Sequence, residues 1–405
     1  MTDSNNLRSE PPVGDPLRER ITAAWLRDET EHVGELLAAA RFTPQDSSTI
    51  ERTAAGLVER VRTRAERQGV IEAFMREYDL SSEEGVLLMC VAEALLRIPD
   101  QMTADKLIRD KLGGADWDAH LGKSDSLLVN ASSWGLLLTG RMVGLASETR
   151  GNAFGALRRL IGRAGEPVIR LAVRQAMRIM GFQFVMGRTI EEALARSAKA
   201  PGYRHSFDML GEGALTSADG ARYQQAYRKA ILAIGASGPG GSFRNADVFG
   251  APSISVKLSA LHPRYEHGQR ARVHRELIPR VLELAQLAKA QGIGFTIDAE
   301  EADRLELSLE VIVGACEDPS LAGWNGYGLA VQAYQKRAPF VLDYLIDAAR
   351  RAGRRMPVRL VKGAYWDSEI KRAQVEGLDG FPVFTRKIYT DVSYLACARK
   401  LLAAP

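Results

Sequence analysis

Five short β-rich runs alternate with longer helical stretches in the part of the chain that follows Gly202. The runs have the apolar and β-branched character of strands, and the stretches between them have apolar residues at helical spacing. The predicted strands are 206–210, 254–259, 294–300, 328–334 and 358–364. The predicted helices are 217–236, 269–291, 302–316, 336–352 and 366–401, the last broken near 377–382. A strand followed by a helix, repeated in series, predicts a parallel sheet.

The number of repeats narrows the choice of architecture. Repetition at this length favours a (β/α) barrel over an open sheet. A closed barrel of this class has eight units, whereas the chain contains five and stops at residue 405, soon after the fifth helical region. We therefore predict an incomplete (β/α)8 TIM-like barrel over residues 191–405, and we expect the sequence to be a fragment of a longer protein.

The first half of the chain is helical in pattern almost throughout. The polar residues 1–16 predict a disordered leader. Residues 17–67 predict two helices separated at 44–47, with too few apolar residues to bury themselves alone. We expect this helical arm to pack either on a partner subunit or on its own subunit. Residues 68–190 predict a helical domain, so the fold class is α/β preceded by an all-α part.

Composition and charge bear on several functional classes. The chain has 54 Lys and Arg against 50 Asp and Glu, a balance that does not by itself indicate nucleic acid. Its three cysteines (Cys90, Cys316 and Cys397) are far apart and lack zinc-site spacing, which fits a reducing cytoplasm. No apolar run reaches the roughly 18 residues that predict a membrane span.

Polar side chains gather at the carboxyl ends of the predicted strands, the end of a (β/α) barrel that carries function. They are Asp208, Glu212, Lys257, Asp298, Glu300, Glu301, Gln332, Tyr334, Lys362, Tyr365 and Trp366. Arg359 lies within the fifth strand on the same face as Val361, a position from which it can point inward. A lysine and an aspartate in neighbouring strands are costly to bury unless they pair. We therefore expect Lys257 to pair with Asp298, either as a structural ion pair or as part of a site.

The residues alone leave three chemistries open. The first is a Schiff base on Lys257, as in an aldolase-type lyase. The second is a flat anionic cofactor, held by Arg359, Lys362, Gln332 and Trp366; the cations would meet its negative charge and the indole would stack on it. The third is a metal site built on Asp298, Glu300 and Glu301. This is the weakest, because strand alternation separates one carboxylate from the other two and no histidine lies nearby.

Longer segments of the sequence closely resemble the bacterial proline utilization A family of bifunctional proline and glutamate-semialdehyde dehydrogenases. In the barrel region they are SVKLSALHPRYE (255–266), IDAEEADRLELSLEVI (297–312), GWNGYGLAVQAYQKR (323–337), VRLVKGAYWDSEIKRAQ (358–374) and RKIYTDVSYLACARKLL (386–402). In the helical part they are LSSEEGVLLMCVAEALLRIPD (80–100) and NASSWGLLLTGRMV (130–143). The likeness extends from about residue 17 to the end of the chain.

This resemblance implies an FAD enzyme on a distorted (β/α)8 barrel that oxidises L-proline to Δ1-pyrroline-5-carboxylate and passes electrons to a membrane quinone. It also implies a cytoplasmic protein associated peripherally with the inner face of the membrane, and a homodimer formed through the N-terminal helices. The family's aldehyde dehydrogenase domain would lie downstream and is absent here. Because the family's ribbon-helix-helix domain is also absent, we expect no binding to operator DNA.

The resemblance also implies roles for individual residues. Lys257 would meet the proline carboxylate with Asp298 beside it, Tyr365 would wall the proline pocket, and Arg359 would lie near flavin N5. The implied FAD-binding residues are Asp298, Ala330, Gln332, Arg359, Val361, Lys362, Gly363, Ala364, Trp366 and Thr385, and no metal is implied. Two alternatives remain: a Schiff-base lyase that uses Lys257, and a non-catalytic fragment that acts only in dimerisation.

Overall fold

The computed structural model describes residues 14–65, 185–243 and 247–404. The chain divides into two compact units, residues 1–50 with 197–405, and residues 51–196. Nearly all of the predicted leader and most of the predicted helical domain lie outside the described residues.

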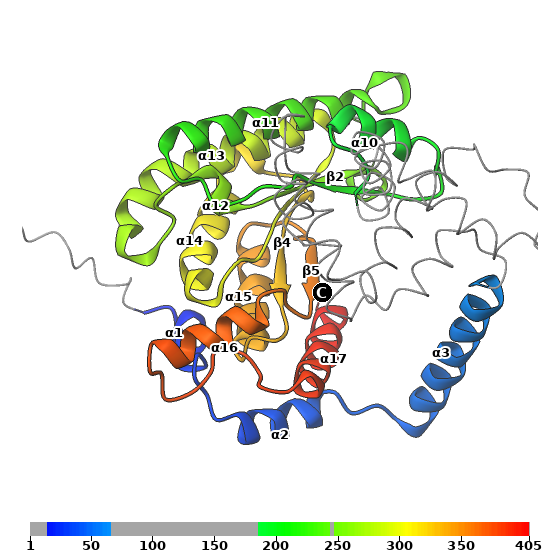
Figure 1. The fold of residues 1–405 in the computed structure, drawn as a ribbon, viewed down its shortest axis with the longest axis vertical. Helices are drawn as coiled ribbons and strands as arrows, with labels where there is room; N and C mark the ends of the chain where they lie inside the picture. Colours follow the sequence, from blue (N-terminus) through cyan, green and yellow to red (C-terminus); the bar gives the residue numbers. More distant parts are fainter. Residues whose placement is uncertain (1–13, 66–184, 244–246, 405) are drawn as a thin grey trace, which may run out of the picture. The chain divides into compact units, whose positions relative to one another are not determined.

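A parallel sheet forms the centre of the unit that contains residues 197–405 (Figure 1). Its strands are β1 (Ser206–Asp208), β2 (Ser253–Val256), β3 (Gly294–Ile297), β4 (Tyr327–Gln332) and β5 (Val358–Val361). They lie in sequence order, and each strand pairs in parallel with the next. All five predicted strands are present, and each ends two or three residues earlier than predicted.

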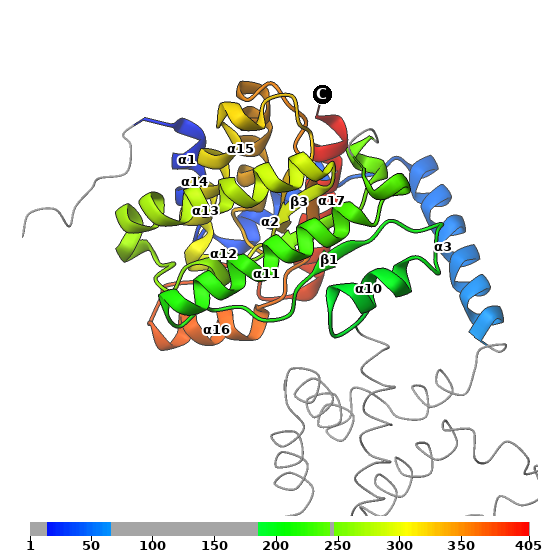
Figure 2. The same ribbon diagram turned by 90° about the horizontal axis from the view of Figure 1, so that it is seen from above.

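Helices follow the strands in the predicted alternation. The long ones are α11 (Ser217–Ala236), α13 (Arg270–Gln291), α14 (Leu305–Cys316), α15 (Ala338–Arg351), α16 (Trp366–Val375) and α17 (Lys387–Ala403), and shorter ones are α10 (Ile190–Ser197) and α12 (Leu258–Leu261). Helices α11 and α13 run side by side over one face of the sheet (Figures 1 and 2). The described residues therefore form five β/α units of a half-barrel, and the break predicted in the last helical region separates α16 from α17.

Strand alternation gives the sheet an apolar outer face and a polar inner face. Ile254, Phe295 and Tyr327 pair with one another along the ladder, and all three side chains are buried. The row one residue further along the strands is polar. In it Asp208 pairs with Ser255, and Ser255 pairs with Thr296. Because partners on adjacent strands point to the same face, this second row and the residues that follow it lie on the inner side of the half-barrel.

The N-terminal part forms three helices where the sequence predicted two. They are α1 (Pro16–Ala23), α2 (Glu29–Ala39) and α3 (Pro44–Ala65). The predicted separation at 44–47 is wrong, because Pro44 is the first residue of α3. Proline suits a first helical position, where its fixed φ is already helical and its missing N–H has no partner to lose.

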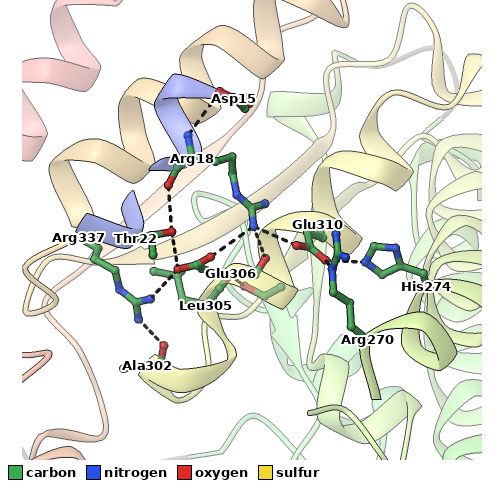
Figure 3. Close-up of polar contacts among 11 residues, drawn as sticks. Asp15, Arg18, Thr22, Arg270, His274, Ala302, Leu305, Glu306, Glu310 and Arg337 are labelled. Atoms are coloured by element: carbon green, nitrogen blue, oxygen red, sulfur yellow. Dashed lines mark hydrogen bonds and ion pairs between the residues drawn. The ribbon is translucent and has the colours of Figure 1, made fainter. Parts of the chain in front are cut away.

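Helices α1 and α2 pack on the β/α units of their own chain. In α1, Arg18 donates to Glu310 of α14 at 3.1 Å, and Thr22 donates to Glu306 at 3.0 Å (Figure 3). Arg337, which is almost fully buried at the start of α15, pairs with the same Glu306 at 3.9 Å. The predicted arm therefore contributes two helices to the barrel unit.

Among the described residues, none of the helices combines the length and the apolar character of a membrane span.

Candidate active site

Asp298 occupies the centre of a group of charged side chains at the carboxyl end of the sheet. It directly follows β3, and its backbone N–H donates to Val256 at 2.9 Å, which places it beside the end of β2. Lys257, the next residue after β2, donates from Nζ to Asp298 Oδ2 at 2.7 Å. Both side chains are largely buried. The predicted pair of Lys257 with Asp298 is therefore confirmed.

A second carboxylate holds the same lysine. Asp208, the last residue of β1, accepts from Lys257 Nζ through both of its carboxylate oxygens, at 3.0 and 3.1 Å. Burial on its own lowers the pKa of Lys257, but the hydrogen bonds and charges of Asp298 and Asp208 outweigh burial and raise the pKa above its ordinary value. Lys257 is therefore held as a cation.

Ser255 and Arg359 complete the group on the other oxygen of Asp298. The Ser255 hydroxyl donates to Asp298 Oδ1 at 2.6 Å, and Arg359 donates to that hydroxyl at 2.8 Å. Arg359 also pairs directly with Asp298 Oδ1. One aspartate thus joins cations from β2 and β5. Ser255 is not among the residues predicted from the sequence, although strand alternation places it on the same face as Lys257.

Ala330 explains how an arginine on β5 reaches an aspartate beyond β3. Ala330 pairs with Arg359 of β5. Gly328 pairs with Thr296 of β3, so Ala330, two residues after Gly328, is level with Asp298, two residues after Thr296. Asp298, Ala330 and Arg359 therefore stand in one row across three strands. Since the alanine side chain is only a methyl group, the long Arg359 side chain passes over β4 to Asp298.

Gln332 ties together the loops that follow β3 and β5. Its Nε2 donates to the Glu300 carbonyl at 2.8 Å, and its Oε1 accepts from the Ala364 N–H at 3.3 Å. The Glu300 carboxylate accepts the N–H of Ser259 at 3.0 Å, away from Asp298. Burial raises the pKa of Glu300, although the hydrogen bond from Ser259 opposes the shift. Among the described residues, no group of three or more His, Cys, Asp or Glu side chains could hold a metal ion.

The turn after β5 presents two aromatic side chains. Gly363 has φ +141°, and a Cβ there would lie 2.4 Å from the Tyr334 ring, so this position favours glycine. Tyr365 is half-buried; burial, followed by the charges of Glu212 and Glu300, raises its pKa to about 12. Trp366 begins α16, and 41% of its side chain is exposed.

Two predicted cofactor-binding residues are engaged elsewhere. Lys362 donates to Asp391 of α17 at 2.6 Å, on the opposite side of β5 from Arg359. Thr385 donates to Glu29 of α2 through its N–H at 2.8 Å and its hydroxyl at 2.6 Å. These contacts to neighbouring helices could not be predicted from strand patterns. Val361, at the end of β5, is partly buried.

The donor set suits a flat, negatively charged group. The side chains of Arg359, in β5, and Lys362, just after it, are 40% and 49% exposed, so both cations remain partly accessible, on opposite sides of the strand. Trp366, at the start of the next helix, is also exposed. The carboxamide of Gln332 lies at the end of the neighbouring strand. Cations can meet negative charge on such a group, an amide can reach ring heteroatoms, and an indole can stack on a flat ring.

Family comparisons cover both halves of the chain. A model described as proline dehydrogenase matches residues 192–405. A model described as the proline utilization A proline dehydrogenase N-terminal domain matches residues 15–62, and one described as the DNA-binding domain of proline dehydrogenase matches residues 70–184.

Known proteins of this kind are similar over almost the whole chain. The bifunctional protein PutA of Salmonella typhimurium is 54% identical over 393 residues, which cover 96% of this chain and 29% of the relative. PutA of Rhizobium meliloti is 53% identical over 389 residues, which cover 95% of this chain and 31% of the relative. A crystal structure of a Bradyrhizobium japonicum proline utilization A mutant aligns with a TM-score of 0.67 and 50% identity, covering 98% of this chain and 38% of that chain.

The chain thus spans about three tenths of the length of the curated relatives it matches. The proline dehydrogenase model matches more than half of the chain, including all five strands and the charged group at their ends. The chain therefore belongs to the proline dehydrogenase family, and it corresponds to the proline dehydrogenase region of bifunctional PutA proteins.

Proposed function

We propose that the chain catalyses the FAD-dependent oxidation of L-proline to Δ1-pyrroline-5-carboxylate and passes the electrons to a membrane quinone, as part of a bifunctional protein. The observation that carries this proposal is the connected group of Lys257, Asp298 and Arg359 at the carboxyl end of the sheet. It combines a cation suited to a substrate carboxylate with a second cation suited to a cofactor that becomes negatively charged.

Substrate binding is assigned to Lys257 and Asp298. Lys257 is held as a cation by two carboxylates, and its ammonium group would pair with the carboxylate of proline. Asp298 would lie beside the cationic ring nitrogen of the substrate. Tyr365, half-buried at the start of α16, would wall the pocket and keep water from the reacting carbon.

FAD binding is assigned to the end of β5 and its neighbours. The isoalloxazine would contact Gln332 and Arg359, and it would also lie against Ala330 and Val361. The remainder of the cofactor would be held by Lys362, Gly363, Ala364, Trp366 and Thr385. When bound, the flavin supplies the hydride acceptor for the oxidation of the ring.

A Schiff-base lyase is the weaker assignment. Its nucleophile must be a neutral amine, whereas Lys257 forms ion pairs with Asp208 and Asp298 and its pKa is raised. Treatment with borohydride in the presence of a carbonyl substrate would trap an adduct on Lys257 only if the lyase assignment were right.

Partners of the whole protein remain predictions. We propose a homodimer formed through the N-terminal helices and peripheral attachment to the inner face of the membrane. The size of the purified chain and its sedimentation with lipid vesicles test these two points separately.

The reaction is tested most simply through its product. The chain is incubated with FAD, L-proline and a soluble quinone, and the cyclic imine is detected by its coloured adduct with 2-aminobenzaldehyde. We expect the adduct with L-proline and none with D-proline, because Lys257 and Asp298 fix the carboxylate and the ring nitrogen in one arrangement. An equal yield from both enantiomers contradicts the proposed binding mode.

A further inference from the structure

The loop between α16 and α17 forms part of the wall beside Trp366. The indole N–H of Trp366 donates to the Phe384 carbonyl at 2.8 Å. The Phe384 N–H in turn donates to the Tyr334 carbonyl at 2.8 Å, and Val383 forms a bridge with Gln335. The position of the Trp366 ring therefore depends on where this loop lies.

Glu29, the first residue of α2, holds the loop from the other side. One oxygen of its carboxylate accepts the Thr385 N–H at 2.8 Å and the other accepts the Thr385 hydroxyl at 2.6 Å. Helix α2 lies beyond the carboxyl ends of β4 and β5, next to the start of α17 (Figure 1). Hydrogen bonds to a charged acceptor are stronger than those between neutral groups, so this contact restrains the loop.

His32, about one turn after Glu29 on α2, contacts the same loop at Phe384. Its buried ring stacks between Phe340 and Phe384, with centroids 5.9 and 5.7 Å apart. Its Nε2 donates to the Lys336 carbonyl at 2.9 Å. The apolar face of α2 packs with Phe384 and Ala396 in one cluster, to which it contributes Val33, Leu36 and Ala40.

We infer that α2 is a positioning element of the candidate active site, in which Glu29 holds Thr385 and thereby the wall that carries Trp366. This inference rests on the proposed function, because it assigns the wall to flavin binding. Glu29 touches neither substrate nor cofactor in this assignment. It acts through Thr385 and Phe384 on the position of the indole.

The opposite role for Glu29 would be competition. A carboxylate bound to an N–H and a hydroxyl resembles a cofactor phosphate, and in that case it would have to leave when the cofactor binds. The described contacts favour positioning, since the same helix is fixed by the stacked His32 and by the apolar cluster around Phe384. The two roles predict opposite changes in FAD affinity when the carboxylate is removed.

The experiment compares Glu29→Ala and Glu29→Gln with the matched control Glu31→Ala in the full chain. Glu31 lies on the same helix, its side chain is 68% exposed, and among the described residues it pairs with Arg27, at 3.7 Å. Amide hydrogen exchange of the segment 381–386 is measured without FAD, and FAD affinity is measured by quenching of flavin fluorescence.

We expect exchange at Thr385 to rise about tenfold or more in Glu29→Ala, as expected for loss of a charge-assisted hydrogen bond. The Kd for FAD should rise several-fold in the same variant. In Glu29→Gln both the exchange rate at Thr385 and the Kd for FAD should lie between those of Glu29→Ala and the parent chain, because the carboxamide oxygen still accepts one hydrogen bond. In Glu31→Ala both values should match those of the parent.

Unchanged exchange at Thr385, or tighter FAD binding in Glu29→Ala, overturns the inference. If the parent chain binds no FAD, the proposed function fails. The exchange measurement then still decides whether Glu29 restrains the loop, so the two failures are distinguishable.

Discussion

The guanidinium of Arg359 pairs with Asp298 across the strand that separates them. Arg359 belongs to β5 and Asp298 follows β3, while β4 lies between the two. Ala330 is the β4 residue in their row, and its methyl group leaves the space through which the arginine passes. A contact between second-neighbour strands therefore depends on a small residue on the middle strand.

Substitution of Ala330 tests this dependence directly. Ala330→Leu should separate Arg359 from Asp298 and overpack the inner face, at a cost of about 1–3 kcal/mol in the free energy of unfolding. Ala330→Ser adds little volume and should retain the contact. Urea unfolding of both variants measures the change in the free energy of unfolding, and FAD affinity shows whether the inner face of the half-barrel is altered. Equal stability and equal FAD affinity for the leucine and serine variants would show that Ala330 does not control the space.

Removal of the Arg359 side chain should slow flavin reduction more than it weakens substrate binding. The cation stabilises negative charge that develops on the flavin, and loss of one such group lowers a rate by roughly 10²-fold. Stopped-flow bleaching of FAD by L-proline measures the rate in Arg359→Ala. Arg359→Lys keeps the charge and should retain an intermediate rate. Bleaching of Arg359→Ala at the parent rate removes the proposed role.

Removal of the Lys257 side chain should affect proline and spare FAD. Lys257→Ala deletes the cation assigned to the substrate carboxylate, and a charge-assisted contact of this kind is worth roughly tenfold or more in affinity. Lys289→Ala serves as the control, because Lys289 donates to the carbonyls of Ser320 and Ala322, in the segment that precedes β4 and not at the carboxyl ends of the strands. Proline titration of the FAD-loaded variants gives the affinities. Identical proline affinity in Lys257→Ala would refute the assignment.

The stability of the barrel unit should fall in mild acid through His32. Burial, followed by the charge of Arg27, lowers the pKa of His32 below its ordinary value of 6.5, although the hydrogen bond to Lys336 and the charge of Glu35 oppose this shift. Below about pH 6.5 the unfolded chain therefore binds a proton that the folded chain resists. The free energy of unfolding should decrease as pH falls through this range, by less than about 1.4 kcal/mol per pH unit for one proton.

The comparison of His32→Gln with the parent isolates this contribution. Glutamine can still donate to the Lys336 carbonyl, but it does not titrate. Urea unfolding at pH 7.5 and 5.5 should show a smaller loss of stability in His32→Gln than in the parent. The exposed His267 provides the control, and His267→Gln should lose as much stability as the parent. The same pH dependence in all three proteins would exclude His32 as the cause.

The sequence predicted the β/α alternation well, because buried strands and amphipathic helices each have their own periodicity. The pair of Lys257 with Asp298 could also be predicted, since both residues end neighbouring parallel strands and neither charge is stable when buried alone. Ser255 was missed because a serine carries no charge that demands a partner.

Contacts between distant parts of the chain could not be predicted in this way. Glu29 and Thr385 are 356 residues apart, and no local pattern links the first turn of α2 to the loop before α17. The separation predicted at 44–47 is absent, because Pro44 begins α3. Tertiary packing of α1 and α2 on the barrel unit gave these polar helices the burial that their own apolar residues do not provide.

The most direct test of the account is a visible spectrum of the purified chain with FAD, recorded before and after anaerobic addition of L-proline. We predict flavin bands near about 450 nm that bleach when proline is added, because Lys257, Asp298 and Arg359 would bring substrate and flavin together. A protein that binds no flavin, or whose flavin bands do not change with L-proline, would contradict the account.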